Sequence, residues 1–325
     1  MGTLYHQLSR FFNIYNAYLK ARRNKKYKQD VIAFSMNLEK NLIKIQEELF
    51  YEKYSPGTYR SFYVYEPKKR EILALQFKDR VVQHAINNIV EPIFEKSFIY
   101  DSYACRTGKG THKAVNRLSY FLKVAKRNWK DVYCLKGDIK QYFPSINREI
   151  LKNMIDKKII DEKMNNLLYI IIDGAPNVKG IPIGNLTSQL FANIYLNSFD
   201  HFIKERLKIK YYVRYMDDFI ILMPLKYQLR ELLLLINDYL IDILQLTLNS
   251  KSSIFNYRRG IDFLGYRIWP THRLLRKRSV KKIKRYLKYC EKNNIPFVER
   301  RQIINAWLGH ASYANTYNLR QKILK

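Results

Sequence analysis

The sequence predicts an α+β fold, because short β-prone segments are interspersed with amphipathic helices. The clearest β-prone segment is Tyr211–Leu222 (YYVRYMDDFIIL), and Asp131–Ile139 (DVYCLKGDI) is a second one. Asp79–Phe94 (DRVVQHAINNIVEPIF) has the helical pattern, with Val82 and Ile86 on its apolar face. The chain has 325 residues, 47% of them hydrophobic, which is enough for two or three subdomains around a large core.

The charge of the chain indicates a polyanionic partner. Lysine and arginine number 59 against 28 acids, which gives a formal net charge of +31. Such an excess favours phosphate contacts and salt-dependent binding. Aromatic residues, at 14% of the chain, are interleaved with the bases and can stack on nucleobases as well as pack in a core.

Cysteines are few and show no paired spacing. Cys105, Cys134 and Cys290 predict neither a disulfide framework nor a zinc site, and a reducing cytoplasmic location is expected. The N-terminus has no signal-peptide core. The strongest apolar run, Leu232–Leu246, is interrupted by polar residues and indicates a core helix, so no membrane partner is expected.

The N-terminal region predicts two helices, over residues 4–21 and 38–49. They are joined by the basic connector Ala21–Asp30 (ARRNKKYKQD), which is either a solvated loop or a phosphate contact. The alternating segment TYRSFYVYEPKKREILALQF then predicts a β-hairpin that turns at Glu66–Lys69. Lys68, Lys69 and Arg70 therefore lie at its tip or just beyond it.

The next helix is expected to be capped by Asp79 and to end near Pro92. Within it, His84 is interpreted as a packed or surface histidine, because no second histidine stands at metal-ligand spacing.

A glycine-rich basic segment, Tyr103–Lys113 (YACRTGKGTHK), precedes another predicted helix. Its glycines accompany Arg106, Lys109 and Lys113, a composition that is typical of a phosphate grip. The spacing is not that of a P-loop, which excludes a nucleotide hydrolase of that kind.

Two adjacent carboxylates, Asp217 and Asp218, interrupt the strongest β-prone run. Adjacent acids are disfavoured in a half-buried strand unless a cation neutralises them. A tight hairpin with the acids at its tip would present hard oxygen ligands to a divalent cation. The alternative is a solvated acid pair on a structural turn.

A third acid, Asp138, ends the strand predicted at Asp131–Ile139, and a helix is expected from near Asn147. Alone, Asp138 could be a capping or loop residue. Together with Asp217 and Asp218 it forms a set that folding can assemble, and two divalent ions held by such acids can drive an in-line phosphoryl transfer.

Two further segments complete the prediction. In Gly174–Leu196, Gly180, Pro182 and Gly184 indicate backbone that approaches a ligand closely, or simple loop punctuation. After Pro270 a basic amphipathic helix is expected, with Val280, Ile283, Leu287 and Cys290 as its apolar stripe. Its bases are Arg273, Arg276, Lys277, Arg278, Lys281, Lys282, Lys284, Arg285 and Lys288.

The tetrapeptide Tyr215-Met216-Asp217-Asp218 resembles the YxDD box of reverse transcriptases, and companion motifs follow in the family's order from about residue 60 to the C-terminus. The resemblance implies a right-hand polymerase with fingers, a palm with an antiparallel sheet and a helical thumb. It assigns catalysis to Asp138, Asp217 and Asp218. It assigns two Mg²⁺ ions, or Mn²⁺ in their place, to Asp138, Ile139, Asp217 and Asp218.

The same resemblance implies a nucleotide site and a nucleic-acid track. Phe143 in KGDIKQYF matches the aromatic steric gate, and KREILALQF carries Arg70, with Lys69, onto a triphosphate contact. The other implied nucleotide residues are Ile183, Gly184, Gln189 and Lys251. The implied nucleic-acid contacts are Arg106, Lys109, Lys113, Arg276, Lys277, Lys281 and Arg285. FLGYRI resembles the primer-grip hairpin.

One departure from many relatives is informative. They have a PQG-type sequence where this chain has Ile183-Gly184, with Ser188-Gln189 downstream. With NAWLGHASYANTY near the end and no appended nuclease or maturase domain, the chain resembles the enzymes of diversity-generating retroelements. These bacterial or phage enzymes copy a template RNA into error-prone cDNA for mutagenic retrohoming and work with a small basic accessory variability protein. The implied partners are template RNA, the RNA/cDNA duplex, dNTPs and that protein.

The predicted segments are an N-terminal helical extension (1–60), fingers (61–131 and 150–180), palm (132–149 and 181–269) and thumb (270–325). Three alternatives stay open. A retron-type or group II intron-like reverse transcriptase would share every catalytic residue. A catalytically idle RNA-binding protein could keep the palm fold, although the intact acids and Phe143 argue against it. A basic membrane-surface protein is the least compatible with three acids at strand ends.

Overall fold

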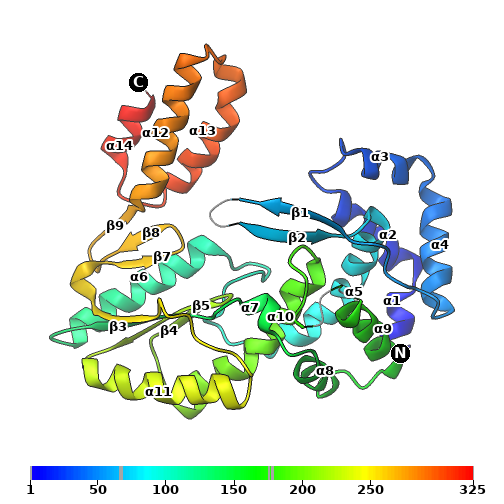
Figure 1. Ribbon diagram of the computed structural model, residues 1–325, viewed down its shortest axis with the longest axis horizontal. Coiled ribbons are helices and arrows are strands. Elements are labelled where there is room, and N and C mark those ends of the chain that lie inside the picture. Colours follow the sequence, from blue (N-terminus) through cyan, green and yellow to red (C-terminus); the bar gives the residue numbers. More distant parts are fainter. Residues whose placement is uncertain (1, 66–68, 175, 177–178, 325) are drawn as a thin grey trace. The chain divides into compact units, whose positions relative to one another are not determined.

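The computed structural model describes residues 2–65, 69–174, 176 and 179–324. The chain divides into two compact units (Figure 1). Unit 1 comprises Met1–Tyr100, Ile139–Lys208 and Ile236–Ser250, and unit 2 comprises Asp101–Asp138, Ile209–Leu235 and Lys251–Lys325. This is a coarser division than the four segments expected from the sequence, whose boundaries stay predictions.

Unit 1 is mainly helical. Its elements are α1 (Leu4–Leu8), α2 (Phe11–Arg22), α3 (Gln29–Met36), α4 (Leu38–Phe50), β1 (Arg60–Val64), β2 (Arg70–Ala74), α5 (Phe77–Glu95), α7 (Tyr142–Ser145), α8 (Arg148–Asp156), α9 (Glu162–Asp173), α10 (Leu186–His201) and the π-helical turn η1 (Phe202–Arg206). A long helix, α11 (Lys226–Asp242), begins in unit 2 and ends in unit 1.

The N-terminal prediction was right in type and wrong in number of helices. The helix expected over residues 4–21 is two helices, α1 and α2. A short helix that was not predicted, α3, follows the basic connector. Strands β1 and β2 form the predicted antiparallel hairpin, in which Val64 pairs with Arg70. The expected turn includes residues 66–68, which lie outside the described residues.

Helix α5 corrects the expected cap. The helix begins at Phe77 with Gln76 as N-cap, and it continues through Pro92 to Glu95. Asp79 is not the cap, because its carboxylate is buried and accepts a hydrogen bond of 2.9 Å from the Tyr54 hydroxyl. The predicted apolar face is confirmed, since Val82 and Ile86 are fully buried.

His84 on α5 is half-buried, as a packed histidine should be, and gives the fold a dependence on pH. Burial lowers the pKa of its imidazole to about 4, and repulsion from Lys20, Lys25 and Arg80 adds to the effect. Because the ordinary value is 6.5, the unfolded chain binds more protons between these two values, so stability is lost as the pH falls through this window.

The variant His84→Gln has no imidazole to titrate at this position. In urea unfolding at about pH 7 and about pH 4.5, we expect wild type to lose more free energy of unfolding than His84→Gln. Equal losses would contradict this assignment.

Unit 2 contains the two larger sheets. Its elements are α6 (Thr111–Asn128), β3 (Tyr133–Asp138), β4 (Tyr212–Tyr215), β5 (Asp218–Met223), β6 (Ser253–Asn256), the 3-10 turn η2 (Tyr257–Arg259), β7 (Ile261–Phe263), β8 (Tyr266–Ile268), β9 (Arg273–Leu275), α12 (Lys277–Lys292), α13 (Phe297–Ala311) and α14 (Tyr317–Leu324). One sheet has the antiparallel order β4-β5-β3-β6 and the other the order β7-β8-β9. The predicted strand at Asp131–Ile139 is thereby confirmed as β3.

The core of unit 2 lies where α6 packs on the sheets. Leu118 and Leu122 of α6 share one buried cluster with Val213 and Ile220 of the first sheet and with Phe263 of the second. Four consecutive residues of β5, Phe219–Leu222, are all buried, although successive residues of a strand point to opposite faces. Both faces of β5 are therefore covered, which explains its continuous apolar run. Segment IDFLGYRI forms two strands, β7 and β8, that turn at Leu264-Gly265, where both residues have positive φ.

The C-terminal helices confirm the predicted amphipathic pattern. In α12, Ile283 and Cys290 are buried, whereas Lys277, Lys281 and Arg285 are exposed. Among the described residues, no helix is long and apolar enough to cross a membrane.

Candidate active site

The acid pair stands on a tight hairpin in unit 2. Strands β4 and β5 pair from Tyr212 opposite Ile221 to Tyr215 opposite Asp218, which leaves Met216 and Asp217 as a two-residue turn. Met216 has φ +56°, the left-handed conformation that such turns require. The expected hairpin is confirmed with one refinement, because Asp217 lies in the turn and Asp218 is the first residue of β5.

A buried arginine, Arg214, braces this hairpin. Its side chain is fully buried and donates to the Met216 carbonyl at 2.9 Å and to the Ser102 hydroxyl at 3.1 Å. Its backbone bonds to Asp101 and Tyr103, each at 3.0 Å. The turn is therefore held by a charge that would be costly to bury without such partners. No sequence pattern indicates this role for Arg214, because an arginine in a strand is usually exposed.

Strand β3 brings the third acid to the hairpin. Asp138 is directly opposite Asp218 in the antiparallel ladder, and Gly137 is opposite Phe219. A Cβ atom at Gly137 would stand 2.0 Å from the Phe219 ring, so the ring lies across the glycine and leaves room for no side chain there. This contact fixes the register that places the two carboxylates opposite each other.

The electrostatics around Asp218 favour a cation. Burial raises the pKa of the Asp218 carboxyl above its ordinary value, and the Asp138 carboxylate raises it further, while Lys136 and Arg276 partly offset both effects. Such a pair is more stable when positive charge approaches, and its oxygen atoms are the ligands that Mg²⁺ prefers. Within the described residues, no three His, Cys, Asp or Glu side chains converge closely enough to hold a metal as they stand.

Lys251 and Ser252 come just before β6, and Ser252 lies beside Asp138. The Asp138 backbone nitrogen donates to the Ser252 hydroxyl at 3.2 Å. Lys251, the implied nucleotide contact, precedes this serine and is exposed. Ser252 is a second positioning residue that no motif had indicated.

In unit 1, the loop that carries Ile183 and Gly184 lies against β2. The Leu73 backbone nitrogen donates to the Ile183 carbonyl at 2.9 Å. Gly184 has φ +134°, and a Cβ there would stand 2.4 Å from the Leu73 carbonyl oxygen. The close approach expected from this glycine is therefore to protein backbone, and it attaches Ile183 to the strand that begins at Arg70.

Phe143 and Gly180 belong to the same part of unit 1. The Ile181 backbone nitrogen donates to the Phe143 carbonyl at 3.0 Å. A Cβ at Gly180 would stand 2.5 Å from the Pro144 Cα atom, so this glycine also permits contact between two backbone segments. The half-buried Phe143 ring packs edge-on against Tyr142, with the ring centroids 5.7 Å apart.

The remaining implied nucleotide residues of unit 1 are exposed. Arg70 opens β2, and the Lys69 ammonium lies 4.3 Å from the centroid of the Tyr63 ring. Gln189 is exposed on the first turns of α10, whereas its neighbour Ser188 is buried. The structure thus brings Ile183 to the strand of Arg70 but gives Gln189 no described contact with either.

The basic loop of unit 2 precedes helix α6, as predicted, and its role as a phosphate grip stays a prediction. Gly108 and Gly110 have φ +73° and +106°. Arg106 donates to the Ser102 carbonyl at 2.8 Å, and the Lys109 ammonium lies 5.0 Å from the Tyr103 ring centroid. Thr111, which begins α6, bonds to the Tyr215 hydroxyl at 3.2 Å and so joins this loop to the acid hairpin. Lys113 follows in the first turn of α6.

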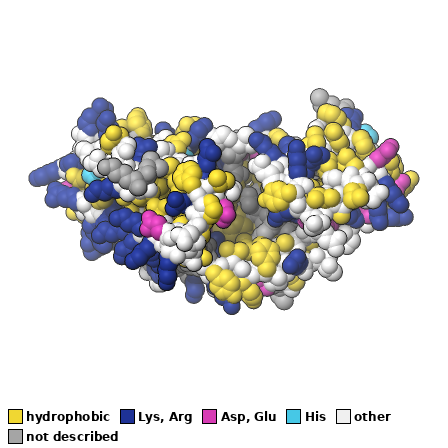
Figure 2. All heavy atoms as spheres, turned by 90° about the horizontal axis from the view of Figure 1, so that it is seen from above, with side chains coloured by type: hydrophobic (Ala, Val, Ile, Leu, Met, Phe, Trp, Pro, Cys, Tyr) yellow, Lys and Arg dark blue, Asp and Glu magenta, His cyan; other side chains and the backbone are white. Residues whose placement is uncertain are grey.

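Basic side chains gather strongly on one face, at the left of Figure 2. On helix α12, Lys277, Lys281 and Arg285 are exposed. Arg276, at the N-cap of α12, instead forms an ion pair with Asp262. Arg276 therefore has a partner inside the protein, and it lies close enough to Asp218 to affect that carboxyl.

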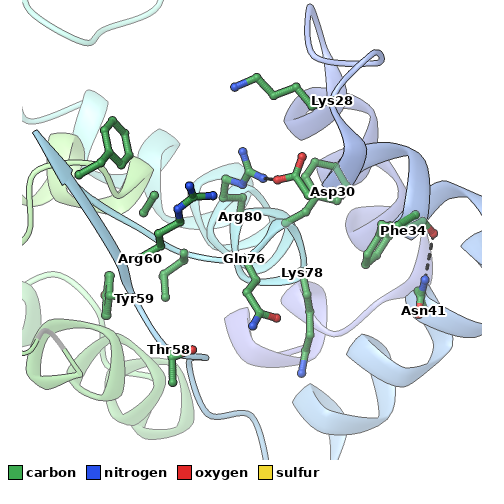
Figure 3. A pocket seen from close by; sticks show the side chains of 15 residues that line it. Lys28, Asp30, Phe34, Asn41, Thr58, Tyr59, Arg60, Gln76, Lys78 and Arg80 are labelled. Carbon is green, nitrogen blue, oxygen red and sulfur yellow. Dashed lines mark hydrogen bonds and ion pairs between the residues drawn. The ribbon is translucent and has the colours of Figure 1, made fainter. Parts of the chain in front are cut away.

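A cavity of about 930 Å³ in unit 1 adds a basic site beside the predicted connector. Lys28, Arg60, Lys78 and Arg80 line it, together with Asp30, which pairs with Arg80 (Figure 3). The rings of Phe34, Phe62 and Phe77 also line it. Within the described residues, the buried Nε atom of Arg80 has no hydrogen-bond partner.

Comparisons with known proteins agree with this arrangement. The family model "Reverse transcriptase (RNA-dependent DNA polymerase)" matches residues 65–268. Protein YkfC of Escherichia coli is 27% identical over 72% of this chain and 71% of its own length. The group II intron-encoded protein LtrA of Lactococcus lactis is 31% identical over 53% of this chain and 30% of its own length.

Solved structures show the same fold. Telomerase from Candida albicans, in complex with a fragment of telomeric RNA, matches 71% of this chain and 50% of its own with a TM-score of 0.54 and 12% identity. A truncated apo telomerase from Candida tropicalis matches 73% of this chain and 60% of its own with a TM-score of 0.53 and 16% identity. The chain spans about half the length of these telomerases and 30% of LtrA. Its fold is the α+β right-hand polymerase, and the chain belongs to the reverse transcriptase family of RNA-dependent DNA polymerases, with homologues among group II intron-encoded proteins.

Proposed function

We propose that this protein copies a template RNA into error-prone cDNA for mutagenic retrohoming in a diversity-generating retroelement. Two Mg²⁺ ions would be held by Asp138, Asp217 and Asp218, with Ile139 adjacent. Bound there, the ions would activate the primer 3′-hydroxyl and neutralise the pyrophosphate leaving group. The cross-strand pairing of Asp138 with Asp218 supports this role, because two opposed carboxylates repel each other and a bound cation relieves that repulsion.

The nucleotide-positioning residues stand in unit 1. By resemblance, Arg70 and Lys69 contact the triphosphate and Phe143 excludes a ribose 2′-hydroxyl. The observation that carries the mutagenic proposal is the bond from the Leu73 nitrogen to the Ile183 carbonyl at 2.9 Å, because it attaches Ile183 to the strand of Arg70. An apolar side chain beside the incoming nucleotide offers shape but no hydrogen bond, which weakens discrimination between bases.

A polar side chain at position 183 should restore discrimination. We expect Ile183→Gln to lower misincorporation at template adenines by about tenfold, while Ile183→Leu, which keeps the apolar character, leaves it high. The measurement is sequencing of cDNA made in vitro from an RNA template that contains all four bases. An adenine error rate that is the same in Ile183→Gln and wild type would refute the proposal.

The single-stranded part of the template has a suitable site in the unit 1 cavity. Four cationic side chains around three phenylalanine rings provide both phosphate contacts and stacking surfaces. Template RNA, the RNA/cDNA duplex and dNTPs are therefore the proposed ligands. A small basic accessory protein completes the proposed assembly, and a cytoplasmic location in a bacterial or phage context is part of the same proposal.

A second candidate is a group II intron-like reverse transcriptase, which the 31% identity to LtrA favours. It would use the same acids and Mg²⁺. In that case wild-type cDNA would contain no excess of errors at adenines, so the sequencing experiment separates the two candidates.

A further inference from the structure

A second basic and aromatic surface lies in unit 2, formed by η2, the turn between β8 and β9, and the adjoining side of α6. We call it the β8–β9 patch and define it by Arg258, Arg259, Arg267, Trp269, His272 and Arg273. None of these residues belongs to the catalytic or nucleotide-binding sets described above.

The aromatic part of the β8–β9 patch is rigidly built. The Trp269 ring lies across Gly260, where a Cβ atom would stand 2.5 Å from it, and its Nε1 atom donates to the Arg258 carbonyl at 3.1 Å. The exposed His272 ring stacks on Trp269, with the centroids 4.7 Å apart and the planes within 13°. The Arg267 guanidinium stands 5.6 Å from the Trp269 centroid. The result is a fixed stack with His272 at its exposed end.

The charges of the patch are mostly uncompensated. Among the described residues, Arg258 pairs with Asp131 at 3.3 Å, whereas no ion pair is formed by Arg259, Arg267 or Arg273. The end of α6 extends the positive charge. The Lys126 ammonium lies 5.6 Å from the Tyr257 ring centroid, and the neighbouring bases Lys123, Arg127 and Lys130 are exposed.

Beside the stack is an open cleft of about 370 Å³, lined by Trp269, His272, Arg273, Asn116, Ser119 and Asn315 among others. Arg273 is held in place there, because its guanidinium donates to the Asn116 side-chain oxygen at 2.6 Å and its backbone nitrogen donates to the Asn315 side-chain oxygen at 3.1 Å. The volume is at the small end of the range for ligand sites and suits a single nucleotide. Amide and hydroxyl groups in the lining can bond to the edge of a base.

The family resemblance assigns the β7–β8 hairpin to the primer, and the patch lies away from the turn of that hairpin. That assignment concerns the β7–β8 turn at Leu264-Gly265, whereas the patch surrounds the turn at the opposite end of β8.

We propose that the β8–β9 patch binds RNA outside the copied stretch, with an unpaired nucleotide stacked on His272 and its phosphates held by Arg258, Arg259 and Arg267. Arginine side chains with stacked rings are the combination that binds unpaired nucleotides. The patch would thus anchor the non-copied part of the template RNA. The proposal rests on membership of the reverse transcriptase family and is independent of the mutagenic function proposed above.

The test compares two RNA probes on the full-length protein. One is a hairpin RNA with a long unpaired purine-rich tail outside the copied stretch, and the other is the same RNA trimmed to the copied stretch and annealed to a primer. We expect Arg258→Gln/Arg259→Gln to weaken binding of the long RNA about tenfold, with a smaller dependence of affinity on salt. We expect His272→Ala, which removes only the stacking ring, to weaken it about fivefold. Binding and extension of the trimmed RNA should stay within about twofold of wild type.

Lys157→Gln/Lys158→Gln is the matched control, because it removes two exposed charges elsewhere in the chain and should leave both probes unaffected. A long-RNA affinity equal to that of the control would overturn the proposal. An equal loss of affinity for both probes would also overturn it, because the patch would then belong to the surface that binds the primer–template duplex. If wild type binds the long RNA through the patch but extends no primer, the polymerase function fails and the patch proposal stands.

Discussion

Asp218→Asn is expected to reduce RNA-templated primer extension by at least about a thousandfold, because it removes a metal-ligand charge at the point where phosphoryl transfer needs it. The same substitution should not lower the thermal unfolding midpoint. Burial and the opposing Asp138 carboxylate raise the pKa of the Asp218 carboxyl, so the charged form costs stability in the folded protein. Loss of activity with equal or greater stability distinguishes a catalytic acid from a structural one.

The matched control for this prediction is Asp262→Asn. Asp262 also lies near Asp218 and pairs with Arg276, but the account gives it no role in metal binding. We expect it to retain extension within about tenfold of wild type. Binding of a labelled RNA should persist in both variants, which shows that each one is folded. Substantial extension by Asp218→Asn would contradict the assignment of the acids.

Gly137→Ala is expected to disrupt the site by another route. The new methyl group would collide with the Phe219 ring, which is almost completely buried opposite Gly137. The ring must move or the strands must separate, at a cost of about 2 kcal/mol or more. Because the next pair in the ladder is Asp138 with Asp218, extension should fall together with stability. Thermal unfolding and primer extension on the same preparation measure both effects.

A second substitution tests whether the ring is the cause. The atoms closest to the added methyl group are the outer ring atoms of Phe219, which leucine lacks. Phe219→Leu alone should be destabilising because it leaves a cavity. In combination, Gly137→Ala/Phe219→Leu should be less destabilised than the sum of the two single variants. Simple additivity would show that the glycine is needed for some other reason.

The elements of the site could be predicted from local sequence, whereas their assembly could not. The β-prone runs around Asp138 and Asp217 predicted the two acid-bearing strands because alternation and chain reversal are local properties. The register that pairs Asp138 with Asp218 depends on the Phe219 ring over Gly137, a contact between residues far apart in sequence. Periodicity contains no information on that contact.

The contacts of Arg214, Asp79 and Gly184 also could not be predicted from local sequence. Arg214 occupies a strand where a charge is usually taken to face solvent, yet its partners Ser102 and Met216 make full burial possible. Asp79 has the sequence context of a helix cap but bonds to Tyr54, which lies outside the helix. Gly184 indicated a close approach, and only the fold shows that the neighbour is the Leu73 backbone. In each case one partner is distant in sequence (Ser102, Tyr54 and Leu73), and the residue type alone fits two environments.

The most direct test of the central claim is primer extension by the wild-type protein on an RNA template with dNTPs and Mg²⁺. We expect a DNA product whose synthesis stops when the metal is chelated and is lost in Asp218→Asn, although both proteins bind the RNA. If wild type binds the primed RNA but makes no DNA with Mg²⁺ or Mn²⁺, the palm is catalytically idle and the central claim is wrong.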